Sequence, residues 1–434
     1  MKLAVTIFEE TPQRAIEAIR ALDADHDAIE LRVDAFRGHA VDWPAVRAAT
    51  SKPVIATNRG RGHVDVSTAL AAGIDFVDVE WGGVIPNVHC DRIVLSHHDY
   101  DGMPDVESLV PAMRAAGCAH VKVAVTPRDF ADNARLLALL DGRSDLTVIG
   151  MGGRGLYARI LAPFFGSAMQ FVSVDEAHSA APGQLALDRA LAIYGPHRQA
   201  LRADTIFAIT GNPAAHSGSP AIHNALFRER GVAAAYAIFE TENFLDTAAP
   251  FARGERFAPK GLSVTAPLKE EALAFAQRTG AEIAPNALEA GAVNTLVRIG
   301  GRIVADNTDV DGFSALIGKV SARSSAVVGA GGTARAALVA LRRAGIAATV
   351  FNRTSGKLDS RPLDALSSWR GDLVINTLPG NVVIALPPAD TIIEAAYGGI
   401  EAAYGGESRA TFTGLDLLRA QAVRQNELFL EACK

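Results

Sequence analysis

The sequence predicts an α/β protein that begins with a closed (β/α)8 barrel of the TIM type and continues with a two-lobed α/β unit. Three observations support this prediction. The 434-residue chain exceeds a single ordinary core, so two or three domains are expected. Eight short β-rich runs recur in about the first 195 residues. The second half contains a glycine-rich turn between a strand and a helix, which is typical of a dinucleotide-binding Rossmann domain.

The eight runs of the first half are separated by intervals that leave room for helices, as in a parallel barrel. They occupy residues 3–8, 28–33, 53–57, 75–80, 92–96, 120–125, 146–151 and 169–174. In such a barrel the active site lies at the C-terminal ends of the strands. We therefore expect functional side chains at, or just after, the ends of these runs.

The run at 120–125 places a lysine among valines. Val121, Val123 and Val125 alternate with Lys122 and Ala124, so Lys122 points to one side of a buried strand. The chain has only eight lysines beside 34 arginines, which makes a lysine in an apolar strand less incidental. A buried amine loses its proton more readily, and a neutral amine can form a Schiff base with a ketone. The alternative is a lysine whose stem is buried while its head reaches water.

Other polar side chains gather at the predicted strand ends. They are Glu30, Arg32, Arg59, Glu80, His98, Arg159 and Gln184. Some of them also have purely structural explanations. Glu30 and Arg32 share one side of a strand and could form an ion pair at the barrel mouth. His98 could be a hydrogen-bonded core histidine.

Three glycines after the seventh run, Gly150, Gly152 and Gly155, fit the spacing G-x-G-x-x-G. No charged ribose partner follows a next strand, which argues against dinucleotide binding at this loop. We expect a glycine-rich loop that lets a substrate approach the backbone.

The composition restricts the possible partners and the compartment. A net charge of −6 without a basic block disfavours nucleic acid and anionic membranes as partners. A few arginines could still bind an anionic small molecule. Cys90, Cys118 and Cys433 form no metal-binding motif, so neither a disulfide framework nor a structural metal is expected, and a reducing cytoplasm fits. The N-terminus resembles a first strand more than a signal peptide, and no apolar run has the length of a membrane helix.

The second half begins after residues 195–204, which show neither strand nor helix periodicity and are predicted to link two domains. A strand at 205–210 then leads to Ser217 and Ser219, which could simply cap a helix that starts near Pro220. Further strand-to-turn segments follow. They carry Thr265, Lys269, Asn294 and Asp309, and turn-forming hydrogen bonds could explain individual members.

The glycine-rich turn of the second half has the structural context that a dinucleotide site requires. A short apolar strand leads into G-x-G-x-x-A, then an amphipathic helix and a second strand. The turn comprises Gly329, Ala330, Gly331, Gly332, Thr333 and Ala334, and the second strand ends at Asn352, Arg353 and Thr354. Arg353 stands where an NAD site would carry an acid, so the pattern favours the 2′-phosphate of NADP. The alternative is a plain glycine turn with a surface arginine.

The first half resembles type I 3-dehydroquinate dehydratase, through the segments 30–34, 96–100, 121–127, 151–159 and 181–184. The resemblance implies a metal-free dehydration in which Lys122 forms the imine, His98 is the general base and acid, and Glu80 orients His98. It implies substrate binding by Glu30, Arg32, Arg59, Arg159 and Gln184. Two serines usual in the family are replaced here by Ala158 and Ala180, which we expect to loosen substrate contacts without removing catalysis.

Residues 204–434 resemble shikimate dehydrogenase, through the two serines, the segments around Lys269, Asn294 and Asp309, and the glycine-rich turn. The resemblance implies that Lys269 and Asp309 form the catalytic pair and that NADPH is the cofactor. It implies substrate binding by Ser217, Ser219, Thr265, Asn294, Tyr397 and Gln421. The predicted domains are the barrel at 1–197, a substrate-binding domain at 204–312 completed by 414–434, and an NADP-binding domain at 313–413.

The end of the chain departs from that family. The segment IEAAYGG occurs twice in tandem, at 393–399 and 400–406, so either Tyr397 or Tyr404 could be the expected substrate contact.

Together the two halves predict a bifunctional enzyme of the shikimate pathway, and hence of aromatic amino acid biosynthesis. Its ligands would be 3-dehydroquinate, 3-dehydroshikimate and shikimate. One alternative is a quinate or shikimate dehydrogenase fused to a weakly active or non-catalytic barrel that binds ring acids, and another is a ring-acid sensor. The sequence does not indicate an oligomeric state.

Overall fold

The structure of the protein is a computed structural model. It describes residues 1–37, 39–59, 64–83, 90–354, 356–380, 382, 384–396 and 412–434. The chain divides into two compact units. The first comprises Met1–Ile206, Phe227–Glu240 and Asp246–Ala258, and the second comprises Phe207–Leu226, Thr241–Leu245 and Pro259–Lys434. The domain limits predicted from the sequence remain a prediction.

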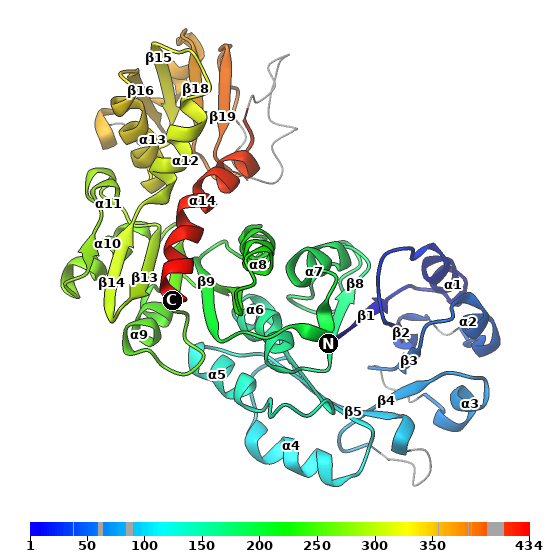
Figure 1. Cartoon of the computed structure of the whole chain (residues 1–434). Helices are drawn as coiled ribbons and strands as arrows, with labels where there is room; N and C mark the ends of the chain where they lie inside the picture. The colour runs from blue at the N-terminus through cyan, green and yellow to red at the C-terminus, as the bar shows by residue number, and fades with distance from the viewer. Residues whose placement is uncertain are drawn as a thin grey trace. The chain divides into compact units, whose positions relative to one another are not determined.

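The first unit contains a nearly closed barrel of eight parallel strands (Figure 1). The strands are β1 (Lys2–Ile7), β2 (Ala28–Arg32), β3 (Val54–Thr57), β4 (Phe76–Glu80), β5 (Ile93–Asp99), β6 (His120–Val125), β7 (Leu146–Gly150) and β8 (Met169–Ser173). Their order is β7-β6-β5-β4-β3-β2-β1-β8. Hydrogen bonds from Ala168 N to Leu146 O (2.9 Å) and from Met169 N to Thr147 Oγ1 (3.1 Å) join its two ends. The predicted barrel is confirmed.

Helices lie between most of the strands. They are α1 (Pro12–Ala21), α2 (Trp43–Ala49), α3 (Val66–Ala71), α4 (Val106–Ala115), α5 (Phe130–Ala138), α6 (Gly152–Leu161) and α7 (Leu187–Tyr194). Between β4 and β5 the described residues contain only the 3-10 turn η2 (Cys90–Arg92). Side-chain oxygens of Thr11, Asp42, Asp65, Asp105 and Asp129 accept backbone N–H bonds at helix starts, which explains where five of the helices begin.

The barrel interior is lined by small and medium apolar side chains. Ala4, Ala28, Ile55, Val94, Ala124 and Phe171 belong to one buried cluster. Because side chains alternate along a strand, Lys122 faces the same side as Ala124 and therefore points into the barrel.

The segment predicted to link the halves is short and includes one turn of regular structure. It contains the 3-10 turn η4 (Arg198–Ala200). Arg198 is buried, and its guanidinium bonds to Asp25 (2.6 Å) and Asp27 (3.1 Å). This ion-pair cluster ties the start of the link to the barrel.

In the second unit, β9 (Thr205–Gly211), β11 (Gly261–Val264), β13 (Thr295–Ile299), β14 (Arg302–Asp306) and β12 (Glu282–Ile283) lie side by side in that order. Strands β9 and β11 are parallel, whereas β13 is antiparallel to both β11 and β14. The helices here are α8 (Ser219–Glu229), α10 (Lys269–Arg278) and α11 (Pro285–Ala290). Strand β10 (Ala234–Glu240) and most of α9 (Leu245–Arg253) belong to the first unit.

The third sheet is fully parallel. It comprises β15 (Ser324–Val328), β16 (Ala347–Asn352), β17 (Arg361–Pro362), β18 (Leu373–Asn376) and β19 (Thr391–Glu394), in the order β17-β16-β15-β18-β19. This doubly wound order confirms the predicted Rossmann-like fold. Helices α12 (Thr308–Ile317), α13 (Gly332–Arg343) and α14 (Gly414–Ala432) contribute Phe313, Ala337 and Leu417 to its core. No helix of the described chain is long and apolar enough to cross a membrane.

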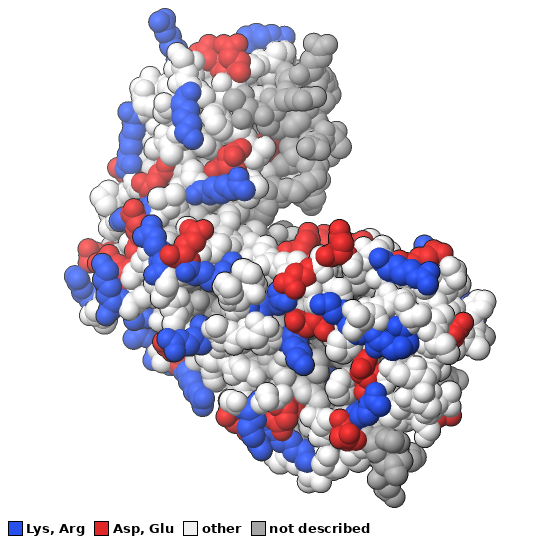
Figure 2. Space-filling view, turned by 45° about the vertical axis from the view of Figure 1, so that its right-hand side comes forward, with Lys and Arg blue, Asp and Glu red and all other residues white. Residues whose placement is uncertain are grey.

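Figure 2 shows lysine and arginine side chains interspersed with aspartate and glutamate on the face that it presents. The charges on this face do not form one extended basic surface.

Candidate active sites

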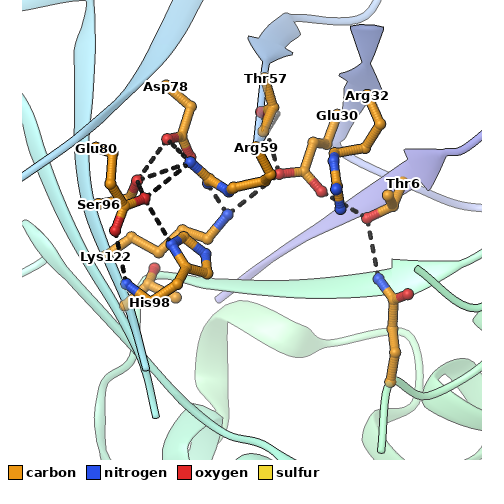
Figure 3. Close-up of polar contacts among 12 residues, drawn as sticks. Thr6, Glu30, Arg32, Thr57, Arg59, Asp78, Glu80, Ser96, His98 and Lys122 are labelled. Carbon is orange, nitrogen blue, oxygen red and sulfur yellow. Dashed lines mark hydrogen bonds and ion pairs between the residues drawn. The ribbon is translucent and has the colours of Figure 1, made fainter. Parts of the chain in front are cut away.

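Lys122 stands at the centre of a polar cluster inside the barrel (Figure 3). Its side chain is only 4% exposed. Its ammonium nitrogen lies 3.1 Å from Glu30 Oε1 and 3.3 Å from Asp78 Oδ2. It also lies 3.7 Å from the centroid of the Phe171 ring, where a cation is attracted by the aromatic face. The sequence predicted burial of Lys122 among apolar neighbours, but the structure places its amine in an ion-pair cluster.

Asp78 is the member of this cluster that the sequence analysis missed. It is buried on β4 and forms a two-pronged ion pair with Arg59 and a hydrogen bond with Ser96. Burial alone would raise its pKa, but the charges of Arg59 and Lys122 hold the pKa of Asp78 far below its usual value. Burial would likewise lower the pKa of Arg59, and the Asp78 carboxylate raises it above its usual value. Asp78 and Glu80 face the same side of one strand, a pattern that could have identified Asp78.

His98 is held by Glu80 through two hydrogen bonds. Glu80 Oε1 accepts the backbone N–H of His98 at 2.8 Å, and Oε2 lies 2.9 Å from His98 Nδ1. Burial lowers the pKa of His98 to about 4, although the hydrogen bond with Glu80 acts in the opposite direction. At neutral pH the ring is therefore uncharged and can accept a proton. Its other ring nitrogen, Nε2, is the one not bonded to Glu80.

Glu30 is fixed by donors on three sides. Thr6 Oγ1 donates to Glu30 Oε2 at 2.8 Å, Thr57 Oγ1 donates to Oε1 at 3.1 Å, and Lys122 also donates to Oε1. Gln184 Nε2 donates in turn to Thr6 Oγ1 at 3.0 Å. Burial raises the pKa of Glu30, but Lys122 and Arg59 together bring it below its usual value. The network thus connects two predicted site residues, Glu30 and Gln184.

Arg32 has a different partner from the one considered in the sequence analysis. Its guanidinium forms two hydrogen bonds with Asp34, at 2.9 and 2.7 Å, and lies 5.0 Å from the centroid of the Phe8 ring. Among the described contacts, Glu30 and Arg32 are not paired with each other, because Glu30 faces Lys122 instead. At the replaced serine position, the backbone N–H of Ala180 donates to Gln184 Oε1 at 2.8 Å.

Arg159 is buried on α6 with part of its guanidinium unpartnered. Its Nε and Nη1 atoms are buried and have no hydrogen-bond partner among the described residues. Burial lowers the pKa of Arg159 to about 10, so it stays charged at neutral pH. Buried donors of this kind could bind an anionic group of a small molecule, such as a carboxylate.

The glycines after β7 have a structural explanation that the sequence analysis did not give. A Cβ atom on Gly150 would lie 2.2 Å from the carbonyl oxygen of Gly155, and Gly152 has a φ of +73°. Gly150 and Gly155 are therefore required by close packing of the strand end against its helix. The expectation that this loop lets a substrate approach the backbone remains a prediction beside this packing role.

The second unit contains a cavity of about 120 Å³. Six of the predicted substrate-binding and catalytic residues line it. The lining includes Ser219, Thr265, Lys269, Asn294, Asp309, Thr333, Gln421 and Gln425. Ser217 is buried beside it and donates a hydrogen bond to Ser219 Oγ at 3.1 Å.

Lys269 and Asp309 form the ion pair of this cavity. Lys269 begins α10, Asp309 lies in the first turn of α12, and their charged groups approach to 2.6 Å. The other carboxylate oxygen of Asp309 accepts a hydrogen bond from Asn294 Nδ2 at 2.9 Å. Lys269 also donates to Thr333 Oγ1 at 3.2 Å. The predicted catalytic pair is thus brought together at the cavity wall.

Helix α14 supplies two glutamines to the cavity. Gln421 Oε1 accepts a hydrogen bond from Thr308 Oγ1 at 2.8 Å. Gln425, which the sequence analysis missed, accepts from Ser263 Oγ at 2.8 Å and donates to Thr295 Oγ1 at 2.7 Å. The two glutamines are four residues apart and so share one helix face, which could have identified Gln425. Tyr397 and Tyr404 lie outside the described residues.

The glycine-rich turn joins β15 to α13. Gly329 has a φ of +106°, and a Cβ atom there would lie 2.4 Å from Thr377 Oγ1. Gly331 caps the start of α13 without close neighbours. Asn352 ends β16, its side chain bonds to Thr354 O at 2.9 Å, and Arg353 is exposed. Among the residues that the structure describes, no group of three or more metal-ligating side chains is arranged to hold a metal ion.

Two family models match the chain. Residues 3–199 match type I 3-dehydroquinase, and residues 209–296 match the substrate-binding domain of shikimate dehydrogenase. The chain therefore joins a type I 3-dehydroquinase domain to a substrate-binding domain of the shikimate dehydrogenase type. Both family resemblances inferred from the sequence are confirmed. Lys122 and Glu30 belong to the dehydroquinase domain, and Asn294 belongs to the matched part of the dehydrogenase domain.

The chain is also similar to curated multifunctional proteins. The bifunctional 3-dehydroquinate dehydratase/shikimate dehydrogenase of Arabidopsis thaliana is 28% identical over 400 residues, which cover 81% of this chain and 64% of the relative. A pentafunctional AROM polypeptide of Lachancea thermotolerans is 30% identical over 407 residues, which cover 83% of this chain and 25% of the relative. The chain thus spans less than two thirds of the length of either relative.

Two solved structures are also similar. The dehydroquinate dehydratase and shikimate dehydrogenase of S. pombe AroM are 23% identical, with a TM-score of 0.39, and cover 100% of this chain and 98% of that chain. Shikimate 5-dehydrogenase of Thermus thermophilus, in complex with NADP(H) and shikimate, is 28% identical with a TM-score of 0.42. This match covers 52% of this chain and 93% of that chain.

Proposed function

We propose that the chain is a bifunctional enzyme of the shikimate pathway. The dehydroquinase domain would dehydrate 3-dehydroquinate to 3-dehydroshikimate, and the dehydrogenase domain would reduce this product to shikimate with NADPH. The observation that supports this best is the presence of one lysine-centred polar cluster in each matched domain. Its ligands are therefore small ring acids. None of the three cysteines forms a disulfide in the structure, and we propose the cytoplasm as the compartment.

In the first reaction, the Lys122 amine attacks the ring ketone, and the carbonyl oxygen leaves as water. The product is an iminium group, whose positive charge lies where Glu30 and Asp78 already surround the ammonium (3.1 and 3.3 Å). This cation draws electron density from the neighbouring carbon and makes its C–H bond acidic. The carboxylates that bind the resting cation therefore also stabilise the reactive one.

His98 completes the dehydration as base and then acid. Its neutral ring takes the proton from the acidified carbon, and the bond Glu80 makes to Nδ1 leaves Nε2 as the accepting atom. The same proton then passes to the departing hydroxyl, which leaves as water and creates the ring double bond. Hydrolysis of the imine consumes one water and releases Lys122. The overall loss is one water molecule per turnover.

Arg159 is proposed to bind the carboxylate of the ring. Its Nε and Nη1 atoms have no partner among the described residues, so the guanidinium has N–H donors available for a carboxylate. Gln184 and Arg59, which border the Lys122 cluster, are proposed to contact the ring hydroxyls.

In the second reaction, the Lys269–Asp309 pair would bind the ketone of 3-dehydroshikimate. The ammonium group donates a proton to the oxygen that becomes a hydroxyl, and Asp309 stabilises the cation until then. Ser217, Ser219, Asn294 and Gln421 surround the cavity with donors for the carboxylate and hydroxyls.

The residues of the glycine-rich turn fit NADPH. Gly329 has a φ of +106°, and a Cβ atom there would collide with Thr377, so the turn needs glycine to keep its shape. The N–H groups at the start of α13 would bind a phosphate. NADPH bound there would supply the hydride. Arg353 at the end of β16 would bind the 2′-phosphate.

A coupled assay tests the proposal. The chain is mixed with 3-dehydroquinate and NADPH, and the absorbance of the reduced nicotinamide is followed. Wild type should consume NADPH, Lys122→Ala should not, and Lys122→Ala should regain activity when 3-dehydroshikimate is supplied. Lys269→Ala should still form 3-dehydroshikimate but leave NADPH unconsumed. A quinate dehydrogenase with an inactive barrel would consume NADPH in Lys122→Ala, and a sensor would consume none.

Borohydride provides an independent test of the covalent step. Reduction during turnover should attach the mass of the ring acid to Lys122, and peptide mapping would locate it. Trapping at another lysine, or none at all, would contradict the assignment of Lys122.

A further inference from the structure

The hydroxyl of Thr333 contacts the proposed proton donor of the reductase. From sequence, Thr333 was expected to bind the cofactor as part of the glycine-rich turn. In the structure its Oγ1 atom accepts a hydrogen bond from Lys269 Nζ at 3.2 Å and lies at the wall of the substrate cavity. The two residues belong to different helices, Thr333 to α13 and Lys269 to α10.

The surroundings hold the Lys269 side chain against this helix start. A Cβ atom on Gly332 would lie 3.2 Å from Lys269 Cδ and 3.3 Å from Lys269 Cβ. The absence of a side chain at Gly332 thus leaves room for the lysine stem. The backbone carbonyl of Lys269 accepts the N–H of Val293 at 2.9 Å. The stem and backbone are therefore fixed, and the rotation of the ammonium group is the remaining freedom.

An ammonium group has three N–H donors. Within the described residues, Lys269 donates one to Asp309 at 2.6 Å and one to Thr333 at 3.2 Å. Once two of the three N–H bonds point at their acceptors, the direction of the third is set as well, because the bonds around an ammonium nitrogen are tetrahedral. We propose that Thr333 is a positioning residue for Lys269, and that its hydroxyl orients the third N–H of the ammonium group toward the ketone in the cavity.

The proposal deepens the reductase activity proposed above and rests on it. It also gives the glycine-rich turn a second role. Within one turn, Gly329 and Gly331 would contact the nucleotide, and Thr333 would contact the proton donor Lys269. Placement of the cofactor and orientation of the proton donor would then depend on the same few residues.

The test compares variants of the full chain. Thr333→Val removes the hydroxyl at nearly constant shape, and Thr333→Ser retains it. The matched control is Thr279→Val, at the opposite end of α10, where the hydroxyl bonds only to backbone carbonyls of Phe275 and Ala276. Each variant is assayed for kcat and for the KM of NADPH and 3-dehydroshikimate. Turnover of 3-dehydroquinate by the same chain serves as the control for folding.

Thr333→Val should lower the reductase kcat about tenfold, because a hydrogen bond to a charged group that fixes the reacting geometry is lost. The KM for NADPH should change less than about twofold, Thr333→Ser should restore most of kcat, and Thr279→Val should match wild type. In a Lys269→Ala background, Thr333→Val should cause less than about a twofold further loss, because the hydroxyl acts through the lysine.

Several results would overturn the proposal. A raised KM for NADPH with unchanged kcat would make Thr333 an ordinary cofactor contact. Full activity of Thr333→Val, or equal loss in Thr333→Ser, would show that the hydroxyl has no positioning role. A wild-type chain that forms 3-dehydroshikimate but does not reduce it would instead remove the proposed reductase function.

Discussion

Replacing Arg159 by methionine should stabilise the barrel and at the same time disable it. The side chain is buried, and Nε and Nη1 have no hydrogen-bond partner in the described part of the chain. In the unfolded chain these donors bond to water. In the folded protein without substrate, the Arg159 charge is therefore removed from water without compensating hydrogen bonds at these two atoms. Methionine fills a similar volume and has no charge to desolvate.

The size of the expected stabilisation can be worked out from the pKa of Arg159. Burial lowers the pKa of Arg159 from its usual value to about 10, which corresponds to about 3 kcal/mol against the charged form. Because the folded-state pKa is below the unfolded one, this destabilisation is present at all pH values below about 10. Lost packing offsets part of the gain, so we expect the free energy of unfolding to rise by about 1–3 kcal/mol. The melting temperature of the barrel should then rise by about 2–8 °C.

The assay combines thermal unfolding without substrate and dehydratase kinetics. Arg159→Met should show the higher melting temperature and a kcat/KM at least about 100-fold lower, since the proposed carboxylate pair is removed. Arg154→Met is the matched control on the same helix. Its side chain is 48% exposed, so its stability should change by less than about 0.5 kcal/mol. A lower melting temperature in Arg159→Met would refute the reasoning, because it would show that the guanidinium stabilises the fold.

Three further results are expected. The dehydratase kcat should stay level between pH 7 and 5 and fall as the pH drops through about 4, because protonation of His98 removes the base; a fall centred near pH 6.5 would contradict the lowered pKa. Gly329→Ala should weaken NADPH binding at least about tenfold, by titration, with 3-dehydroquinate turnover unchanged, because its Cβ would collide with Thr377. Asp78→Asn should lower the free energy of unfolding by about 3–5 kcal/mol, since it removes the buried charge shared by Arg59 and Lys122 and leaves Arg59 paired with the less buried Glu80; an unchanged melting temperature would count against this.

The barrel could be predicted from sequence because its strands combine strong local patterns with regular spacing. The eight expected runs lie within a few residues of β1 to β8, and the third sheet follows from the strand, glycine turn and helix around Gly329. The connection between β4 and β5 is the exception, because only a 3-10 turn is described where a helix would complete the eighth unit.

Partners within the sites were harder to predict, because they depend on how distant segments meet. Lys122 on β6 bonds to Glu30 on β2, and these strands are not neighbours in the sheet. Only closure of the barrel brings the two side chains together. The contact between Lys269 and Thr333 likewise joins two helices that are separate in sequence. Local patterns thus identified most of the residue types at each site, but not which donor meets which acceptor.

The cluster around Lys122 surrounds one nitrogen atom with groups that stabilise a positive charge. Glu30 and Asp78 lie 3.1 and 3.3 Å from Nζ, and the centroid of the Phe171 ring lies 3.7 Å from it. In the proposed covalent step the iminium group carries its positive charge at this same nitrogen, so the same carboxylates stabilise it. A purely apolar pocket would leave that iminium unsupported. The carboxylates therefore assist the step in which the iminium draws electrons from the neighbouring C–H bond, and that step is the proposed proton abstraction by His98.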